Sequence, residues 1–424
     1  MEKEKLRGRI DWITTLIPFV IVLSMMLVFM LIPTQSKLFV DTLRGFFGDT
    51  IGIYYVILGI GSVLVSLYLA FKDKYGQIRL GNVDKPVYSN FAWGTMIFTS
   101  TMAADIMFYS LIEWALYGAE PHVAEMGKMQ LWAPTYPLFH WGPLAWGFYV
   151  ILAISFAFMM HVRKRERQRF SEAVRPLLGN RVDGPLGKLI DIVAVFAMVC
   201  ATATTFSLAT PLLASALASV CGISTNVVLT IGILLLICAV YTITVLLGMS
   251  GISKLASFCS YMFFALLFYF LFLGGETRYI LETGFQSLGN MAQNFIGLST
   301  YMDPLRENNF PQNWTIYYWA YWLVWCIATP FFIALISKGR TIKNLVFGTF
   351  GWGLAGTYMS FIILGNYGLA QQMKHGLDVT GYIAGGGEMY QAILNIFSTL
   401  PLPELALILL VVTMIAFYST TLDG

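Results

Sequence analysis

The sequence predicts an all-α polytopic membrane protein, and three observations support that fold class. Of the 424 residues, 57% are hydrophobic and only 12% are charged, which is far from the composition of soluble domains. Ten apolar runs are long enough to cross a hydrocarbon core of about 30 Å, which takes about 20 helical residues. Lysines and arginines gather in alternate connections between these runs, as they do on the cytoplasmic side of membranes.

The ten expected spans follow one another along the whole chain. They cover 12–32, 51–71, 91–117, 137–162, 189–217, 227–247, 255–273, 317–336, 345–364 and 405 to the end. Several are longer than a straight crossing requires, which predicts tilt or an internal break. Between the seventh and eighth spans, 276–302 has apolar residues at helical spacing and predicts an amphipathic helix along the outer face.

The basic connections set the expected orientation. Positive charges gather before the first span and at 72–85, 163–188 and 338–343. With ten spans all four groups fall on one side, so the N-terminus is expected to be cytoplasmic. The loop at 163–188 is interpreted as part of this topology pattern, with an anionic-lipid site as the alternative.

The segment 314–338, WTIYYWAYWLVWCIATPFFIALISK, is the most unusual part of the chain. Trp319, Trp322 and Trp325 recur at three-residue spacing and therefore fan over one side of a helix. Pro330 removes a backbone donor in mid-segment, which predicts a break that protein or a wet cavity must accommodate.

A second aromatic wall opens the fourth span, in FHWGPLAWGFY at 139–149. Trp141, Trp146 and Tyr149 fall within about 140° of one helical face, beside Pro143. Two such walls predict a cage for an organic cation, because a quaternary ammonium donates no hydrogen bond and must be held by ring faces. Core packing or an interfacial belt of aromatic residues is the alternative.

Asp105 is expected near the middle of the apolar third span, where a carboxylate is costly and therefore suggests a functional site. The alternative is a structural aspartate that pairs with Lys254 or with hydroxyl groups. Glu113, eight residues further on, is expected nearer the outer interface, where it could simply be solvated.

Two hydroxyl-rich stretches are candidate Na⁺ ligands, at 99–101 and in FYSTTLD at 417–423. Such groups on an interrupted helix suit Na⁺, although they often bond back to the preceding turn instead. The five cysteines have no metal-binding spacing and are expected as buried apolar residues. Enzyme motifs such as a Walker A loop or HExxH are absent from the sequence, and the basic residues favour topology over nucleic-acid binding.

The motif FHWGPLAWGFY and the segment WTIYYWAYWLVW with its following ISKGRT resemble the two most characteristic motifs of the betaine, carnitine and choline transporter family. The resemblance covers nearly the whole chain, including SLATPL at 207–212. It implies a LeuT-like fold with two leading helices (1–90) and two inverted repeats of five helices (91–273 and 314–424), separated by an outer helix region at 274–313. Because the sequence stops inside the tenth span, the second repeat is expected to be truncated.

The resemblance also implies a substrate site and partners. Trp141, Trp146, Tyr149 and Trp322 would form the substrate box, and Trp325 would belong to the pathway or to a second site. The family implies an inner-membrane location and a possible homotrimer. Ala103 and Ala104 stand where many members have glycine, so an unwound helix is less expected there.

The coupling ion is expected to be Na⁺ or H⁺. One Na⁺ site is implied by the residues that match the family's sodium motifs, which are Thr99, Met102, Phe417, Thr420 and Thr421. Cys259 stands where sodium-independent exchangers carry an arginine, which disfavours exchange by that mechanism.

Choline is the expected substrate, because Asp105 matches a position that is acidic in choline carriers and glycine in betaine-specific members. A bare cation needs a counter-charge, whereas betaine and carnitine carry their own. The expected function is uptake of a quaternary ammonium compound by alternating access. The alternatives are betaine or carnitine uptake or exchange, with Asp105 serving the coupling ion, and a sensor or binding protein that has lost transport. An enzyme is not expected.

Overall fold

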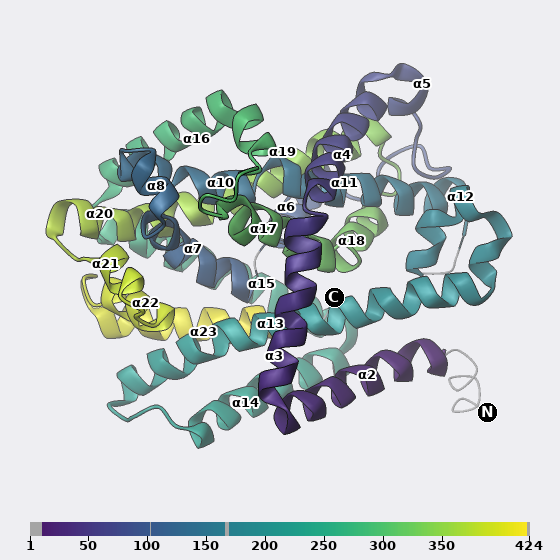
Figure 1. The fold of residues 1–424 in the computed structure, drawn as a ribbon. Coiled ribbons are helices and arrows are strands. Elements are labelled where there is room, and N and C mark those ends of the chain that lie inside the picture. Colours follow the sequence, from purple (N-terminus) through teal and green to yellow (C-terminus); the bar gives the residue numbers. More distant parts are fainter. Residues whose placement is uncertain (1–10, 102, 166–168, 422–424) are drawn as a thin grey trace. The chain divides into compact units, whose positions relative to one another are not determined.

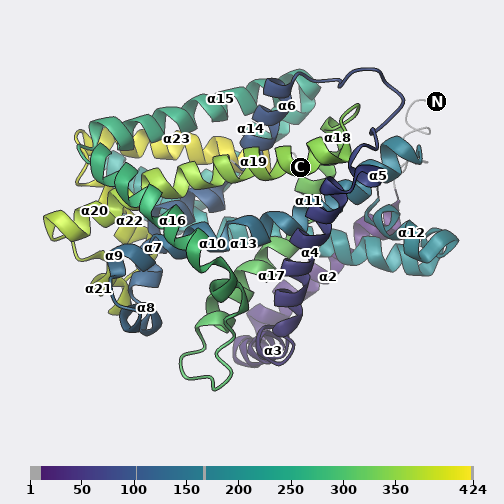
Figure 2. The same cartoon turned by 90° about the horizontal axis from the view of Figure 1, so that it is seen from above.

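The computed structural model describes residues 11–101, 103–165 and 169–421, without the side chains of 248–250, 252, 253, 420 and 421. Helices make up most of these ranges (Figures 1 and 2), and one isolated β-bridge joins Arg79 to Thr341. The described chain forms two compact units. Of the described residues, unit 1 comprises 11–93, 144–165, 169–203 and 309–350, and unit 2 comprises 94–101, 103–143, 204–308 and 351–421.

Unit 1 contains the first two apolar helices and both halves of the broken tryptophan-rich segment. Its elements are α2 (Trp12–Leu31), α3 (Pro33–Gly45), a π-helical turn (Phe46–Thr50), α4 (Ile53–Phe71), α5 (Asp73–Gly76), α11 (Pro143–Ala157, from Leu144 onward), a π-helical turn (Phe158–Val162), a 3-10 turn (Phe170–Val174), α12 (Arg175–Leu178), a 3-10 turn (Gly179–Asp183), a π-helical turn (Pro311–Thr315), α17 (Ile316–Val324) and α18 (Ala328–Ile336).

Unit 2 contains α7, the helix on which Asp105 and Glu113 lie. Its elements are α7 (Ala104–Gly118), α8 (Pro121–Glu125), α9 (Met129–Trp132), α10 (Thr135–His140), α14 (Val227–Leu246), α15 (Gly248–Phe268), a π-helical turn (Tyr269–Leu273), α16 (Thr277–Thr300), a π-helical turn (Phe361–Gly365), α20 (Asn366–His375), α21 (Val379–Ala384), α22 (Met389–Phe397) and α23 (Pro403–Thr421). Helices α6 (Asn90–Thr99), α13 (Pro185–Cys221) and α19 (Ile342–Ser360) contribute residues to both units. Within unit 2, α15 and α23 pack side by side (Figure 2).

The predicted all-α polytopic fold is confirmed. Among the described residues, seven helices are long and apolar enough to cross a membrane, and nine spans result if each of two bent helix pairs counts as one. The shorter apolar helix at Pro403–Ser419 matches the tenth expected span. Large apolar side chains on α2 and α14 are exposed, which suits helices surrounded by lipid. The expected helix at 276–302 is also present, as α16.

Small residues allow α4 and α11 to approach closely in unit 1. A Cβ on Gly147 would lie 2.7 Å from a methyl group of Val63, and one on Gly59 would lie 3.4 Å from the ring of Phe148. Glycine at such contacts is a common way for membrane helices to pack backbone against backbone. This contact fixes α11, which carries two of the predicted site residues.

The ISKGRT motif connects α18 to the linker that precedes α6. The guanidinium of Arg340 donates to the side chain of Asn90 and to the carbonyl oxygens of Tyr88 and Ser89, and lies 4.0 Å from the ring centroid of Trp93. The indole of Trp93 donates in turn to Ser337, at 3.0 Å. The motif therefore holds the end of one broken span against the beginning of another, a role in packing that its sequence did not suggest.

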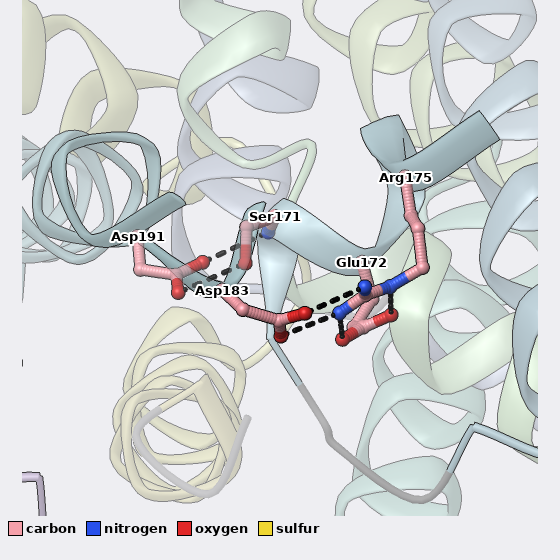
Figure 3. Close-up of polar contacts among 5 residues, drawn as sticks. All are labelled: Ser171, Glu172, Arg175, Asp183 and Asp191. Atoms are coloured by element: carbon pink, nitrogen blue, oxygen red, sulfur yellow. Dashed lines mark hydrogen bonds and ion pairs between the residues drawn. The ribbon is translucent and has the colours of Figure 1, made fainter. Parts of the chain in front are cut away.

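The basic loop between α11 and α13 contains an ion-pair network (Figure 3). Arg175 donates to both carboxylate oxygens of Glu172 and to both of Asp183, at 2.5–2.9 Å. Nearby, Asp191 accepts from the backbone N–H and the hydroxyl of Ser171. The hydrogen bonds to Glu172 and Asp183 raise the pKa of Arg175. These contacts order part of a loop whose charge was interpreted from sequence only as a topology pattern.

Candidate functional site

Three rings of the predicted substrate box meet in unit 1. The ring centroids of Tyr149 and Trp322 are 4.7 Å apart, those of Trp146 and Trp322 are 5.6 Å apart, and those of Trp146 and Tyr149 are 5.7 Å apart. The interplanar angles of 55–77° make these contacts tilted or edge-to-face. All three side chains are at most 6% exposed. Ring edges therefore point at ring faces, which is the favoured arrangement for aromatic pairs.

The three rings pack against one another rather than around an open space. A cation attracted to a ring face lies within about 6 Å of the centroid, and rings on opposite sides of it must be correspondingly far apart. Centroid distances of 4.7–5.7 Å bring the rings into direct contact. A cation enclosed by all three rings would first have to separate them.

The tryptophan-rich helix breaks just after this cluster. Helix α17 ends at Val324, α18 begins at Ala328, and the two are bent by 55°. Pro330 lies in the first turn of α18, where its missing N–H leaves a carbonyl of the preceding segment without its helical donor. The break predicted from Pro330 is confirmed, and it lies on the N-terminal side of the proline.

Trp319 and Trp325 occupy different environments on this segment. Trp319 is fully buried on α17. Trp325 caps α17 and is half-buried, and its indole nitrogen is buried with no hydrogen-bond partner in the described part of the chain. A buried N–H without a partner is costly, so Trp325 offers a donor at the break.

Trp141 lies in unit 2, and the expectation that it shares a helix with Trp146 and Tyr149 is wrong. It caps the short helix α10, and Pro143 begins α11 after it. Gly142 and Pro143 end the first helix, because proline disfavours helical geometry in the residue before it. The ring of Trp141 packs against Tyr109 at 5.7 Å and Phe361 at 5.3 Å between centroids.

Glu113, which from the sequence could simply have been solvated near the outer interface, is fully buried. One carboxylate oxygen accepts a hydrogen bond from the indole N–H of Trp141 at 2.7 Å, and the other accepts one from the hydroxyl of Tyr117 at 2.5 Å. The Tyr117 oxygen also lies 2.5 Å from Nδ1 of His140. The four-residue spacing of Glu113 and Tyr117 on α7 could have indicated their pairing. Their partners on α10 could not be identified from sequence spacing.

Asp105 does not lie in mid-helix as expected. Helix α6 ends at Thr99 and α7 begins at Ala104, so Asp105 occupies the first turn of a new helix and is 5% exposed. The positive end of a helix dipole stabilises a carboxylate there. Lys254, suggested as its partner, is exposed on α15.

The helix is broken between Thr99 and Ala104, where Ala103 and Ala104 had made an unwound helix less expected. The hydroxyls of Thr99, Ser100 and Thr101 each donate to a carbonyl three residues earlier, and Ala103 has an extended backbone. Such bonds compete with continued helix. The break thus follows a run of three hydroxyl residues, in a stretch of sequence that contains no glycine.

The candidate Na⁺ ligands are only partly described. The Thr99 hydroxyl bonds to the carbonyl of Met96 at 3.1 Å. The ring of Phe417 is buried against Phe263. Met102 lies outside the described residues, as do the side chains of Thr420 and Thr421. Cys259 is buried on α15, and the described ranges contain no group of three or more histidine, cysteine, aspartate or glutamate residues that could hold a metal ion.

Broken apolar helices that carry a buried aromatic cluster and buried carboxylates are typical of secondary transporters. The family model described as BCCT, betaine/carnitine/choline family transporter, matches residues 13–424. The chain belongs to this family and is a multi-pass membrane protein.

Three curated relatives are similar over most of the chain. The uncharacterized transporter YeaV of Escherichia coli K12 is 28% identical over 87% of this chain and 76% of its own length. A carnitine transporter of Acinetobacter baumannii is 27% identical over 86% of this chain and 66% of its own length. A probable glycine betaine transporter of Desulfitobacterium hafniense is 33% identical over 74% of this chain and 62% of its own length. The matched part of this chain thus spans about two thirds of the length of these relatives.

Proposed function

We propose that this protein is a secondary transporter that imports a small quaternary ammonium compound across the cell's inner membrane by alternating access. The observation that carries the proposal is the cluster of Trp146, Tyr149 and Trp322, which α11 and α17 bring together beside a broken span. Aromatic faces are the main means by which a protein can hold a cation that donates no hydrogen bond. Membership of the family supports the same substrate class.

Choline is the substrate we propose first. Asp105 is a buried acidic residue in the first turn of α7, at the positive end of the helix dipole. A negative group is most useful to a substrate that has no carboxylate of its own. Asp105 would then balance the charge of choline during transport.

Glycine betaine or carnitine is the second candidate, through uptake or through exchange such as that of carnitine for butyrobetaine. The names of two relatives favour it, because one is a carnitine transporter and another a probable glycine betaine transporter. The buried indole N–H of Trp325, which has no partner among the described residues, suits a substrate carboxylate as acceptor. Asp105 would then serve the coupling ion.

The coupling ion is Na⁺ or H⁺ in this proposal. Na⁺ is supported by the hydroxyl-rich break at 99–101, since interrupted membrane helices present the oxygen ligands that Na⁺ takes. A proton is supported by the buried position of Asp105, because a carboxylate in such surroundings can bind one. We also propose that the N-terminus lies on the cytoplasmic side of the membrane.

The test is uptake of labelled choline by the full-length protein in vesicles, with Na⁺ and H⁺ gradients imposed separately and unlabelled betaine as competitor. Accumulation with choline preferred supports the first candidate, and the gradient that drives it identifies the coupling ion. Transport of betaine or carnitine without choline supports the second. Binding of these compounds without accumulation would identify a sensor or binding protein and contradict transport.

A further inference from the structure

Two connections between spans, 72–88 and 337–343, are joined by backbone hydrogen bonds within unit 1. The N–H of Leu80 donates to the carbonyl oxygen of Arg340 at 2.8 Å, and the carbonyl oxygen of Leu80 accepts from the N–H of Gly339 at 2.6 Å. The two segments lie far apart along the chain and together form one surface, which we call the basic surface.

The pairing of the two segments depends on the glycine at position 339. Its φ of +89° is a conformation that residues with a side chain rarely adopt, and a Cβ there would lie 2.7 Å from the carbonyl oxygen of Lys85. On the other segment, a Cβ on Gly81 would lie 3.5 Å from the side chain of Lys338. The close approach thus places Lys85 beside Gly339, the residue that follows Lys338.

Positive charge dominates the basic surface. Its two segments contain seven basic and two acidic residues. Arg340 is buried, and Arg79 donates to the carbonyl oxygen of Gly339. The other five are exposed lysines that form no ion pair with any described residue, namely Lys72, Lys74, Lys85, Lys338 and Lys343. On the basic loop at 163–188, by contrast, Arg175 binds two carboxylates. Cations without such partners leave a positive field that attracts anions.

The basic surface lies where four apolar segments begin or end. Helix α4 ends at Phe71 and α18 ends at Ile336, while α6 begins at Asn90 and α19 begins at Ile342. Each of these helices belongs to a candidate span, so the surface lies at the level of the lipid headgroups. Apolar side chains beside the lysines are exposed, with Phe71 at 66% and Val87 at 57%. Exposed apolar groups next to cations suit a surface that contacts lipid.

We propose that the basic surface binds the phosphate groups of anionic lipids in the adjacent leaflet of the membrane. A lysine ammonium has three N–H donors, and its charge strengthens hydrogen bonds to phosphate oxygens. Clusters of about four to eight lysines and arginines next to a membrane helix attract anionic lipids through such contacts. The binding belongs to the folded protein and does not depend on which substrate the protein carries.

The alternative role for these lysines is to orient the chain during membrane insertion, as basic connections do on the cytoplasmic side. The two roles differ once the protein has folded. Lysines that only direct insertion have no further effect on the lipids, whereas a binding surface keeps anionic lipids next to the protein. An acidic protein segment is a different partner, and a surface made for it would give the protein no preference for anionic lipid.

The experiment measures the association of lipids with the purified full-length protein in phosphatidylcholine vesicles. A trace of pyrene-labelled phosphatidylglycerol or of pyrene-labelled phosphatidylcholine is added, and energy transfer from the tryptophans to pyrene reports lipid next to the protein. The ratio of the two association constants is the preference for anionic lipid. We expect the wild type to prefer phosphatidylglycerol by about ten-fold or more. A ratio near one would overturn the proposal and favour an acidic protein segment as the partner.

Neutral substitutions test whether the lysines carry this preference. Lys85→Gln, Lys338→Gln and Lys343→Gln together should lower it by about ten-fold or more, because each cation close to an anionic membrane surface contributes about five-fold to association. The other basic residues remain, so the orientation of the protein in the membrane should be unchanged. If the triple variant does not accumulate, Lys338→Gln alone should lower the preference by about five-fold. An unchanged preference in either variant would show that the lysines only direct insertion and would overturn the proposal.

Two further variants test whether the paired segments matter. Arg163→Gln, Lys164→Gln and Arg165→Gln together remove three exposed cations from another connection and serve as the matched control, with a preference within about two-fold of the wild type expected. A loss equal to that of the lysine variant would indicate a general attraction by all basic connections and would overturn the assignment to this surface. Gly339→Ala keeps every charge but brings a Cβ against Lys85, so the preference should fall. An unchanged preference in folded Gly339→Ala protein would overturn the part of the proposal that requires the two segments to pair.

Discussion

Tyr149 on α11 and Trp322 on α17 hold their ring centroids 4.7 Å apart, although the two residues come from different segments of unit 1, 144–203 and 309–350. Trp146 completes the group by meeting Trp322 at 5.6 Å. Trp322 is thus the ring that the other two share. Its removal is the most direct way to test whether the cluster binds substrate or only packs.

We predict that Trp322→Leu abolishes most quaternary ammonium uptake, while Trp322→Tyr keeps a measurable part of it. Leucine removes the ring that contacts both neighbours and costs about 2–4 kcal/mol in packing, whereas tyrosine keeps an aromatic face. Uptake in vesicles, corrected for the amount of folded protein, is the measurement.

The matched control for this prediction is Trp12→Leu on α2, because that tryptophan is 50% exposed. It should leave uptake unchanged. If Trp322→Leu transported as well as the wild type, the aromatic cluster would be core packing and the cage hypothesis would be wrong.

We predict that Asp105→Asn raises the choline concentration needed for half-maximal uptake by about ten-fold and changes that for betaine much less. Asparagine can still occupy the first turn of α7 but has no charge, so it removes the attraction for a bare cation. A competition panel of choline, betaine and carnitine measures the difference.

Asp41→Asn on α3 is the control for Asp105, because its side chain is 51% exposed. Asp105→Gly extends the test, since glycine is what the betaine-specific pattern carries there. Unimpaired choline uptake in either Asp105 variant would exclude the counter-charge role and would leave Asp105 to the coupling ion.

The apolar spans and the rings of unit 1 could be predicted from sequence because both depend on local patterns. A run of about 20 apolar residues specifies a membrane helix in almost any context. The break at Pro330 could also be predicted locally, because proline has no backbone N–H to donate.

Other features depended on contacts that the sequence does not display. The break before Asp105 has neither glycine nor proline, and the hydroxyls of Thr99, Ser100 and Thr101 bond back to the chain there. Hydroxyl residues also occur in unbroken helices, so this pattern is ambiguous. The burial of Glu113 was missed because its partner Trp141 comes from another helix.

We predict that Arg175→Met lowers the free energy of unfolding of the purified protein by about 3–5 kcal/mol, a loss typical of removing one partner of a buried ion pair. Arg175 is 8% exposed and Glu172 6%, so the variant leaves a buried carboxylate without its cation, although Asp183 at 43% exposure stays partly hydrated. The stability of Arg175→Lys should lie between that of the wild type and that of Arg175→Met, because lysine keeps the charge but lacks the planar fork that binds two oxygens at once.

The control for Arg175 is Lys37→Met, which breaks an ion pair with Asp41 whose members are both more than half exposed. Exposed pairs one turn apart on a helix contribute about 0.3–0.5 kcal/mol. Thermal melting in detergent should therefore separate the two variants clearly. Equal melting temperatures would show that the network on the basic loop does not stabilise the fold.

The last prediction concerns the pH dependence of the contact between α16 and α20. Glu276 precedes α16 with a side chain that is 7% exposed, and it accepts from Lys374 at 2.5 Å and from His375 at 2.7 Å, at the end of α20. Burial acts to raise the pKa of Glu276, but the hydrogen bonds and charges of His375 and Lys374 outweigh it and lower the pKa below its ordinary value. A carboxyl whose pKa is lower in the folded state stabilises the fold above its unfolded pKa of about 4.3, and this stabilisation disappears as the pH falls through the folded value. We therefore expect the wild type to melt at a higher temperature than Glu276→Gln at pH 7 and pH 5.5, and the difference to shrink progressively below about pH 4. Glutamine is uncharged, like the protonated acid, so the melting temperatures of the two proteins should converge in acid. A difference in melting temperature that stayed constant from pH 7 to pH 3 would show that the charge of Glu276 does not hold these helices together.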